Sequence, residues 1–188
     1  MEMTNTALLE QIRVPVTESS QPAAARRAAV AIAQGTGMDE ATVGKIALIV
    51  TELATNLVKH AKDGELLIRR LHDEEADGVE VLSLDKAPGM SNVGLSMGDG
   101  YSTAGSPGMG LGAVRRTAEA FDIYSQPGTG TVVVARVFAD SRGASRHARP
   151  IGVIRQAKAG EPVCGDNWIA RWFADGWVCA VADGLGHG

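Results

Sequence analysis

A long run of helical periodicity ends in the segment Thr51-Glu-Leu-Ala-Thr-Asn-Leu-Val-Lys-His-Ala61. Glu52 and Asn56 are four residues apart, so on a helix they lie one turn above each other on one face. Taken alone, they fit an incidental acid–amide pair on a solvated face. The segments that follow favour a functional site. The buried side of the helix is predicted by an apolar stripe at helical spacing, formed by Val43, Ile46, Val50, Leu53 and Leu57.

The surrounding sequence predicts a sheet covered by helices. Strands joined by turns, a long polar one over 71–78 and a tight one over 126–130, are expected to pair as antiparallel hairpins, with helices packed on one face. The fold class is therefore predicted to be an α/β (α+β) two-layer sandwich with a mixed, mostly antiparallel sheet. Helices are predicted over 22–34, 39–61 and 113–120, and strands over 11–16, 65–70, 79–84, 121–125 and 131–138.

An aspartate follows the predicted strand 79–84 directly, in Asp85-Lys-Ala-Pro-Gly-Met90. A carboxylate at a strand end can accept hydrogen bonds from an exocyclic amine. The small residue Ala87 and then Gly89 leave backbone room for a flat ligand beside the acid. An ordinary Pro-Gly turn with a capping aspartate explains the same residues equally well in isolation.

A long loop over 91–107, rich in glycine and serine, leads to Gly108-Met-Gly-Leu-Gly112 at a helix start. Loops of this length are typical of functional lids or of disordered segments. Alternate glycines let a ligand approach the backbone, and a helix N-terminus offers unpaired N–H groups to an anion. The spacing is not that of the dinucleotide-binding fingerprint, and no parallel βαβ unit surrounds it. A lone glycine cluster is a weak signal.

The overall composition argues against several classes of protein. The chain has 188 residues, 45% of them hydrophobic, and a formal net charge of −4, which gives no support for nucleic-acid binding. No apolar run approaches the roughly 20 residues that span a bilayer, and no signal peptide is visible. Cys164 and Cys179 lack metal-ligand spacing and suit a reducing cytosol. We therefore expect a cytoplasmic protein that binds neither nucleic acid nor membrane.

The end of the chain differs in character from the first 139 residues. Residues 140–150 are polar and basic without periodicity, which indicates a linker between a domain over 1–139 and a segment over 151–188. Strands are predicted over 151–155, 167–173 and 177–181. A few strands with nothing to pack on cannot form an independent domain. We interpret 151–188 as the opening of a second domain whose remainder is absent.

The order of these elements resembles the GHKL (histidine-kinase-like) ATPase superfamily over roughly residues 10–138. Its N, G1 and G2 boxes are matched by Glu52-xxx-Asn56, Asp85-x-Ala87-x-Gly89 and Gly108-x-Gly110-x-Gly112, and its closing Gly-Thr element by Gly128 to Thr131. Within the superfamily the chain is most similar to the small anti-sigma-factor serine kinases, the RsbT-like switch kinases. Glu52-Leu-Ala-Thr-Asn-Leu57 and the run from Asp99 to Gly112 carry that closer resemblance. The implied fold is the GHKL (Bergerat) ATP-binding fold.

The resemblance implies that the chain is a serine/threonine-protein kinase using ATP and Mg²⁺. Asn56 would coordinate Mg²⁺ through its amide oxygen, since hard cations take oxygen ligands. Glu52 would be the catalytic residue, acting as general base on a serine hydroxyl or positioning it. Phosphoryl transfer depends mainly on positioning and charge neutralisation, so these parts would be sufficient.

The same resemblance assigns the nucleotide-binding residues. Asp85 would accept the adenine amine, and Gly89 would allow close approach. Ala87 stands where the G1 box often has glycine, and we expect a small residue to be tolerated. The phosphates would be cradled by Gly108, Gly110 and Gly112. Thr131 would help to hold the adenine end of the nucleotide.

The substrate implied by the resemblance is a serine or threonine on a STAS-domain antagonist (anti-anti-sigma) protein in bacterial stress or sigma-factor regulation. A sigma factor or a phosphatase would be a further partner. The alternatives are a non-catalytic, ATP-gated module that grasps a partner, or the regulatory half of a SpoIIE-family phosphatase. The sequence does not separate them, because all need the same nucleotide pocket.

The last residues are similar to the first metal-binding elements of SpoIIE-type (PPM, RsbX-like) phosphatases. Gly165-Asp166 and Asp183-Gly184-Leu-Gly-His-Gly188 carry this resemblance. It implies that Asp166 and Asp183 are carboxylate ligands and Gly184 a carbonyl ligand for Mn²⁺ or Mg²⁺, which activates water. Simple hairpin chemistry is the alternative for Asp183-Gly184. The later acidic ligands of the family are missing, so no phosphatase activity is expected from these 188 residues.

Overall fold

The chain divides into two units, Met1–Ala148 and Arg149–Gly188. The computed structural model describes residues 11–61, 63–73, 76–97, 110–140, 153–154, 157–158, 160–161, 164–173 and 176–184. Most of the strand expected over 151–155 lies outside these residues, and its described members, Val153 and Ile154, are not in a strand.

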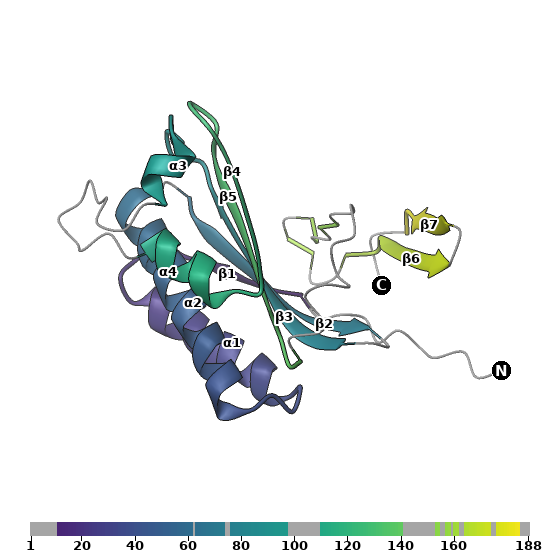
Figure 1. Cartoon of the computed structure of the whole chain (residues 1–188). Coiled ribbons are helices and arrows are strands. Elements are labelled where there is room, and N and C mark those ends of the chain that lie inside the picture. Colours follow the sequence, from purple (N-terminus) through teal and green to yellow (C-terminus); the bar gives the residue numbers. More distant parts are fainter. Residues whose placement is uncertain are drawn as a thin grey trace. The chain divides into compact units, whose positions relative to one another are not determined.

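The first unit is a two-layer sandwich of one sheet and one layer of helices (Figure 1). All neighbouring strands pair antiparallel in the order β1-β2-β3-β5-β4. The predicted fold class is confirmed, with the described sheet wholly antiparallel. The strands are β1 (Gln11–Pro15), β2 (Glu65–Asp73), β3 (Ala76–Asp85), β4 (Ala120–Gln126) and β5 (Gly130–Phe138), and the helices are α1 (Gln21–Gln34), α2 (Glu40–His60), α3 (Val93–Ser96) and α4 (Gly110–Thr117).

The first helix, α1, packs closely because its buried positions are small. Pro22 lies in its first turn, where a missing backbone N–H costs nothing. Three alanines at four-residue spacing, Ala25, Ala29 and Ala33, are fully buried. Small side chains at the contact let the backbones of two packed elements approach each other, so α1 lies directly against α2.

The central helix, α2, is organised by its cap and its apolar stripe. Asp39 caps it, because the carboxylate accepts a hydrogen bond from the Thr42 N–H at 2.8 Å. The stripe predicted from the sequence is buried at Ile46, Val50 and Leu53, whereas Val43 is only half-buried. By length and composition alone α2 could cross a membrane, but its apolar face is the core of this unit.

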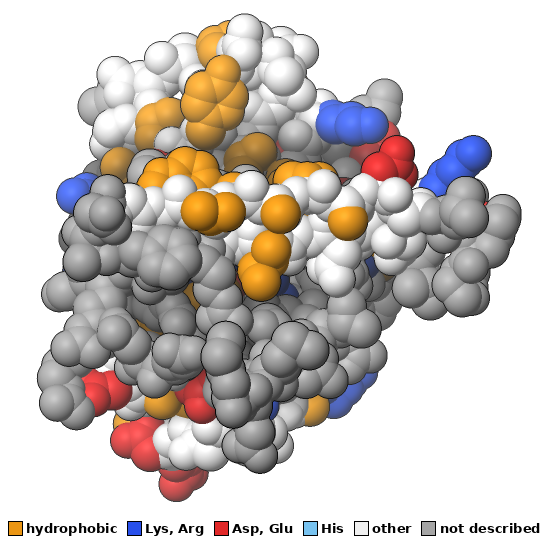
Figure 2. All heavy atoms as spheres, turned by 90° about the vertical axis from the view of Figure 1, so that its right-hand side faces the viewer, with side chains coloured by type: hydrophobic (Ala, Val, Ile, Leu, Met, Phe, Trp, Pro, Cys, Tyr) orange, Lys and Arg blue, Asp and Glu red, His pale blue; other side chains and the backbone are white. Residues whose placement is uncertain are grey.

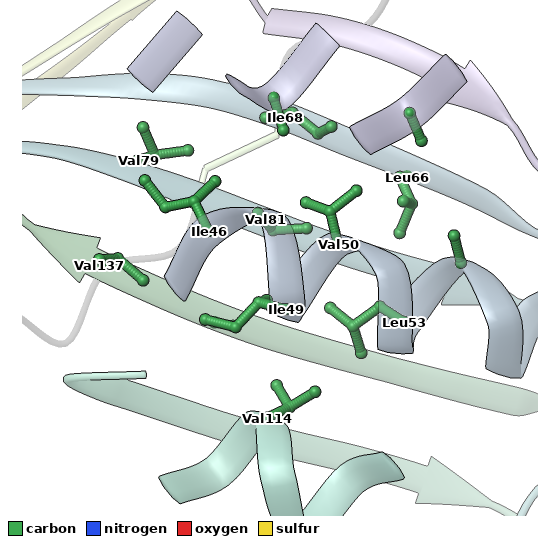
Figure 3. Packing of buried hydrophobic residues seen from close by; sticks show 14 of the residues in the cluster. Ile46, Ile49, Val50, Leu53, Leu66, Ile68, Val79, Val81, Val114 and Val137 are labelled. Atoms are coloured by element: carbon green, nitrogen blue, oxygen red, sulfur yellow. The ribbon is translucent and has the colours of Figure 1, made fainter. Parts of the chain in front are cut away.

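The core lies between α2 and the sheet (Figure 3). Alternate residues of each strand face the helices, as the two-residue period of a strand requires. Each fully buried aliphatic side chain stabilises the fold by about 1.5–3 kcal/mol relative to exposure. The side chains that meet there come from α2 (Ile46, Ile49, Val50, Leu53), β2 (Leu66, Ile68), β3 (Val79, Val81), β5 (Val137) and α4 (Val114).

The opposite face of the sheet carries a row of charges across three strands. Glu80 on β3 is 7% exposed and lies opposite Arg69 on β2 and Arg136 on β5. Each arginine Nε is 2.7 Å from a different oxygen of the Glu80 carboxylate. Pairing both oxygens offsets the cost of burying this charge.

Several elements differ from their predicted bounds, and the largest differences are in α4 and in the hairpin β2–β3. The helix predicted over 113–120 begins at Gly110 and ends at Thr117, because Ala120 already pairs with Arg136 as the first residue of β4. The hairpin predicted with a long polar turn continues to the pair Asp73↔Ala76. Because β2 and β3 pair along their whole length, both strands are longer than the apolar segments from which they were predicted. The predicted loop also contains the single helical turn α3.

The second unit contains one described hairpin, formed by β6 (Asn167–Phe173) and β7 (Gly176–Ala182). Every residue of β7 is exposed. An isolated two-stranded hairpin is at best marginally stable in water. Figure 2 shows hydrophobic side chains at the surface on the side that faces right in Figure 1. Large hydrophobic side chains exposed in this hairpin are Ile169, Trp177, Val178 and Val181.

Candidate functional site

The polar face of α2 is oriented by its apolar stripe. Leu53 and Leu57 are buried, and Glu52 and Asn56 are half-buried one turn apart beside them. A helix fixed by the core therefore holds a carboxylate and an amide in a set relation to each other. A carboxylate can take a proton, and an amide oxygen can bind a hard cation.

Gly110, the first residue of α4, lies against this pair. A Cβ added at Gly110 would stand 3.3 Å from both Nδ2 and Oδ1 of Asn56 and 3.5 Å from Oε2 of Glu52. The structure therefore brings together Glu52, Asn56 and Gly110, which are far apart in the sequence. A residue without a side chain is the natural choice at so close an approach.

The beginning of α4 offers hydrogen-bond donors at the same place. The first N–H groups of a helix have no partner within it, and the helix dipole adds positive charge there. A phosphate group would be stabilised by both effects. Gly112 is buried within this first turn, and Gly108 lies outside the described residues. The arrangement can hold an anion next to a carboxylate and an amide.

The residues predicted to bind the base of the nucleotide, Asp85 and Thr131, lie in a row across neighbouring strands. Asp85 is opposite Thr131, and Thr131 is opposite Ser125, in the registers of β3, β5 and β4. The Asp85 Oδ1 accepts the N–H of Ala87 at 2.8 Å and the N–H of Thr131 at 3.2 Å. Both of these bonds go to one carboxylate oxygen, which leaves Oδ2 for a ligand amine among the contacts that the structure describes.

Two glycines allow the backbone at the end of β3 to pack closely against the β4–β5 turn. Gly89 has φ +75°, and an added Cβ would stand 2.2 Å from the carbonyl oxygen of Gln126. Gly130 has φ +140°, and its Cβ would stand 2.0 Å from the carbonyl oxygen of Asp85. A side chain at either position would force the two backbones apart. Gly89 thus has a packing reason beside the ligand-approach reason predicted from the sequence.

Ser125 is a site residue that the sequence reasoning did not single out. Its hydroxyl oxygen accepts the Met90 N–H at 2.8 Å and lies 2.8 Å from the Thr131 hydroxyl. It was predicted only as the last residue of a strand. The signal that could have found it is the hairpin register, which sets Ser125 opposite Thr131 across a tight turn.

The residues at the strand ends lie on the face of the sheet that the helices cover. Asp85, Thr131 and Ser125 share the face of the core residues Val81, Val133 and Ile123, because each is spaced from its core neighbour by an even number of residues.

The donor set fits a magnesium ion that arrives with phosphates. Among the described residues, no three His, Cys, Asp or Glu side chains cluster as a metal site. One amide oxygen, Asn56, with the Glu52 carboxylate nearby, matches a small hard cation that keeps water and phosphate oxygens as its other ligands. Asn56 would therefore hold the ion only together with the nucleotide.

The second unit brings its three predicted residues near one another. The register pairs Asn167 with Ala182, which sets Asp166 opposite Asp183 just beyond the ladder. A Cβ added at Gly184 would stand 2.2 Å from the carbonyl oxygen of Gly165, so the two backbones touch. Both aspartates are exposed. Two carboxylates and a carbonyl are the kind of oxygen donors that a divalent cation takes.

Comparisons with known proteins give an independent result. Residues 14–137 match the family described as the histidine kinase-like ATPase domain. The match spans both groups of site residues. Over 112 residues the chain is 31% identical to the serine/threonine-protein kinase RsbT of Bacillus subtilis (strain 168), covering 60% of this chain and 84% of that protein.

A solved structure is also similar. The mycobacterial sensor histidine kinase MprB superposes with a TM-score of 0.43 at 13% sequence identity. The superposition covers 70% of this chain and 97% of that one.

Proposed function

This chain belongs to the family of histidine kinase-like ATPase domains, and we propose that it is a Mg-ATP-dependent serine/threonine-protein kinase of the anti-sigma switch type. Its relative RsbT is a serine/threonine-protein kinase. The observation that carries the proposal is the contact of Gly110 with Asn56 and Glu52. This contact brings the N-terminus of α4, which would bind phosphate, next to the proposed general base Glu52 and the proposed cation ligand Asn56.

The residues on α2 and α4 would perform the transfer. The donors at the start of α4 would hold the γ-phosphoryl group, and Asn56 would hold a Mg²⁺ ion, which would supply positive charge beside the phosphates. Glu52 takes the proton of the incoming serine hydroxyl. The serine oxygen forms a bond to the γ-phosphorus while the bond to the bridging oxygen breaks, and ADP leaves.

The base of the nucleotide would lie at the row of Asp85, Thr131 and Ser125. The Asp85 oxygen that makes no contact among the described residues would accept the exocyclic amine of adenine. The two glycine contacts at Gly89 and Gly130 hold this row rigid, which supports its use as a binding surface. No lysine in a phosphate loop is needed in this arrangement.

The proposed substrate is a serine or threonine of a STAS-domain antagonist protein in the cytoplasm, with a sigma factor or phosphatase as a further partner. This step rests on the similarity to RsbT alone. An ATP-gated module that grasps its partner without catalysis remains the second candidate. The half-buried carboxylate of Glu52 beside the cation ligand favours the kinase.

Nucleotide binding is tested by thermal-shift titration with Mg-ATP. A ligand at about 100 times its dissociation constant stabilises by roughly 2.7 kcal/mol, which raises the melting temperature by several degrees. We expect this shift in the wild type and its loss in Asp85→Asn and Asn56→Ala. The matched control Asp122→Asn, an exposed aspartate on β4, keeps the shift. No shift in folded wild type overturns the proposal.

Catalysis is tested with γ-labelled ATP and a panel of purified STAS-domain proteins. Glu52→Gln is expected to bind Mg-ATP like the wild type and to transfer label at least a hundredfold more slowly. Glu40→Gln, an exposed residue in the first turn of the same helix, is the control. A Glu52→Gln protein with wild-type transfer would remove this residue from the chemistry. Nucleotide binding without transfer to any acceptor would favour the non-catalytic module.

For residues 151–188 we propose the start of a SpoIIE-type phosphatase domain. Support comes from the contact of Gly184 with Gly165, which sets Asp166 and Asp183 side by side. Titration with Mn²⁺, followed by the fluorescence of the nearby tryptophans, tests it. Weak binding lost in Asp166→Asn and Asp183→Asn is expected, and Mn²⁺ binding unchanged in both variants contradicts the assignment.

A further inference from the structure

We propose that the groove between α1 and α2 is the contact surface of a symmetric dimer of this chain. In this dimer the arginine end of each groove lies over the acidic end of the other. The inference goes beyond the proposed function and does not depend on it. None of the described residues that line the groove belongs to the proposed nucleotide site.

The groove has a volume of about 440 Å³ and is lined by exposed and half-exposed positions of both helices. The chain turns back within residues 35–39, so α1 and α2 run antiparallel and lie side by side (Figure 1). Small or apolar residues line the middle of the groove, namely Val30, Ala31, Val43 and Gly44. The middle of the groove therefore offers a contact surface without charges.

Charges of opposite sign stand at the two ends of the groove. Arg26 and Arg27 line one end. Glu40 lines the end next to the turn, and the exposed Asp39 precedes it. Seven residues separate Arg27 from Gln34, the last groove residue of α1, so the two ends are about 10 Å apart.

The charges that line the groove have no ionic partners within the described part of the chain. Arg26, Arg27 and Glu40 are all exposed, and none of them forms an ion pair there. The groove therefore has unpaired cations at one end and an unpaired carboxylate at the other.

A second copy of the chain has the pattern that this groove requires. A two-fold axis across the middle of the groove, at right angles to the helices, places Arg26 and Arg27 of each copy over Glu40 of the other. Opposite charges then meet at both ends. Small residues meet in the middle, where they let packed helices approach each other. Any other partner would need to carry the same pattern independently, whereas a second copy has it by identity.

Gly44 has no structural reason within a single copy. A Cβ added there would meet nothing within 4 Å. A glycine in the interior of a helix costs stability relative to alanine. In the dimer Gly44 lies near the two-fold axis, where the missing side chain lets the two copies of α2 come together. The dimer thus accounts for a residue that the single chain does not explain.

Sedimentation equilibrium of the full chain over a range of concentrations measures the dimer. A small contact surface supports a weak complex, so we expect a monomer–dimer equilibrium with a dissociation constant in the micromolar range or above. Raising the salt concentration from about 0.1 to about 1 M shortens the Debye length from roughly 10 to roughly 3 Å, and the dimer should weaken.

The salt dependence also separates this dimer from association through the hairpin β6–β7. The exposed residues of that hairpin that would drive association are hydrophobic, so salt has no attraction between charges to screen there. A wild type that stays monomeric up to its highest soluble concentration, or that associates equally well in high salt, overturns the inference.

Two charge reversals test the symmetry of the contact. Arg26→Glu combined with Arg27→Glu places like charges at both ends, and so does Glu40→Arg alone. Each is expected to raise the dissociation constant roughly tenfold or more. An equimolar mixture of the two variants has opposite charges at both ends again, so it should form a heterodimer about as tight as the wild-type dimer. The control Lys59→Glu with Lys86→Glu makes the same change of net charge as the arginine variant at exposed positions outside the groove, and should dimerise like the wild type.

The mixture decides between a self-complementary contact and a general effect of charge. Variants that dimerise like the wild type overturn the inference, and so does a mixture of folded variants that stays monomeric. All substituted positions are exposed, and thermal melts check that each variant folds. If Glu40→Arg does not fold, a wild-type dissociation constant in the arginine variant still overturns the inference.

Discussion

At the scale of single residues, the contact that carries the proposed chemistry is made by a residue without a side chain. Gly110 brings the start of α4 to Asn56 and Glu52, with an added Cβ 3.3 Å from either polar atom of the Asn56 amide. Such a distance is shorter than normal packing allows, so Asn56 would have to shift by a few tenths of an ångström. A shift of this size matters more to the alignment of reacting groups than to folding.

Gly110→Ala is therefore expected to separate activity from stability. The transfer rate should fall roughly tenfold because Asn56 is displaced, while the melting temperature stays within about two degrees of the wild type. Rates with a STAS-domain acceptor and thermal melts of the same preparations give both quantities.

The matched substitution is Gly44→Ala on the exposed side of α2. An added Cβ there meets nothing within 4 Å. Alanine replaces glycine in a helix interior, so this variant should be more stable by up to about 1 kcal/mol with unchanged activity. If Gly110→Ala transfers phosphate as fast as Gly44→Ala, the contact has no catalytic role.

Some residues of the candidate site could be predicted from the sequence, and others could not. Glu52 and Asn56 follow from helical spacing, and Asp85 follows from its position after an apolar strand. Ser125 has no signal in helical spacing or in a strand end, and beyond the hairpin register its part depends on a hydroxyl distance that only the folded structure gives. The packing of Gly89 against Gln126 likewise arises from a turn distant in sequence.

At the scale of elements, α2 depends on one capping side chain. The hydroxyl and N–H of Thr42 lower the pKa of Asp39 below its ordinary value of 3.8. A carboxyl with a lowered pKa in the folded state stabilises the protein above pH 3.8, and this contribution is lost as the pH falls through the lowered value.

Asp39→Asn is expected to show this dependence. Asparagine also caps a helix but carries no charge, so the variant should melt close to the wild type at pH 7. The small advantage of the wild type should disappear as the pH falls below 3.8. Asp39→Ala has no cap and should melt a few degrees lower at pH 7. Thermal melts from pH 2.5 to 7 measure all three, and a wild-type advantage that grows in acid would contradict the assignment.

Elements with strong periodicity were predictable, and their ends were not. α2 and β5 follow from apolar spacing, whereas α4 begins three residues earlier than predicted because glycines give no periodic signal. The end of α4 is decided by the pairing of Ala120 with Arg136. Such a partner is visible only in the folded sheet.

At the scale of the whole molecule, the first unit contains all the described residues assigned to ATP. A chain ending at Ala148 is expected to fold and to bind Mg-ATP within about twofold of the full chain. It should also aggregate less, because Trp177, Val178 and Val181 are exposed hydrophobic residues of the removed part. Calorimetry and light scattering on both lengths test this. A shortened chain that folds but loses ATP binding would show that the second unit contributes to the site.

The order of strands has a consequence for how the protein is made. Asp85 belongs to the hairpin β2–β3, whereas Thr131 and Ser125 belong to the hairpin β4–β5. Each hairpin closes locally, but β3 and β5 can join only after the whole segment between them has been closed into a loop, which is a slow, long-range step. The proposed adenine end of the site therefore forms only in this long-range step, and we expect a nascent chain still lacking β5 to gain nothing from ATP. In stopped-flow experiments Mg-ATP should slow unfolding and leave the folding rate unchanged. The nucleotide would then stabilise the native state without stabilising the transition state for folding.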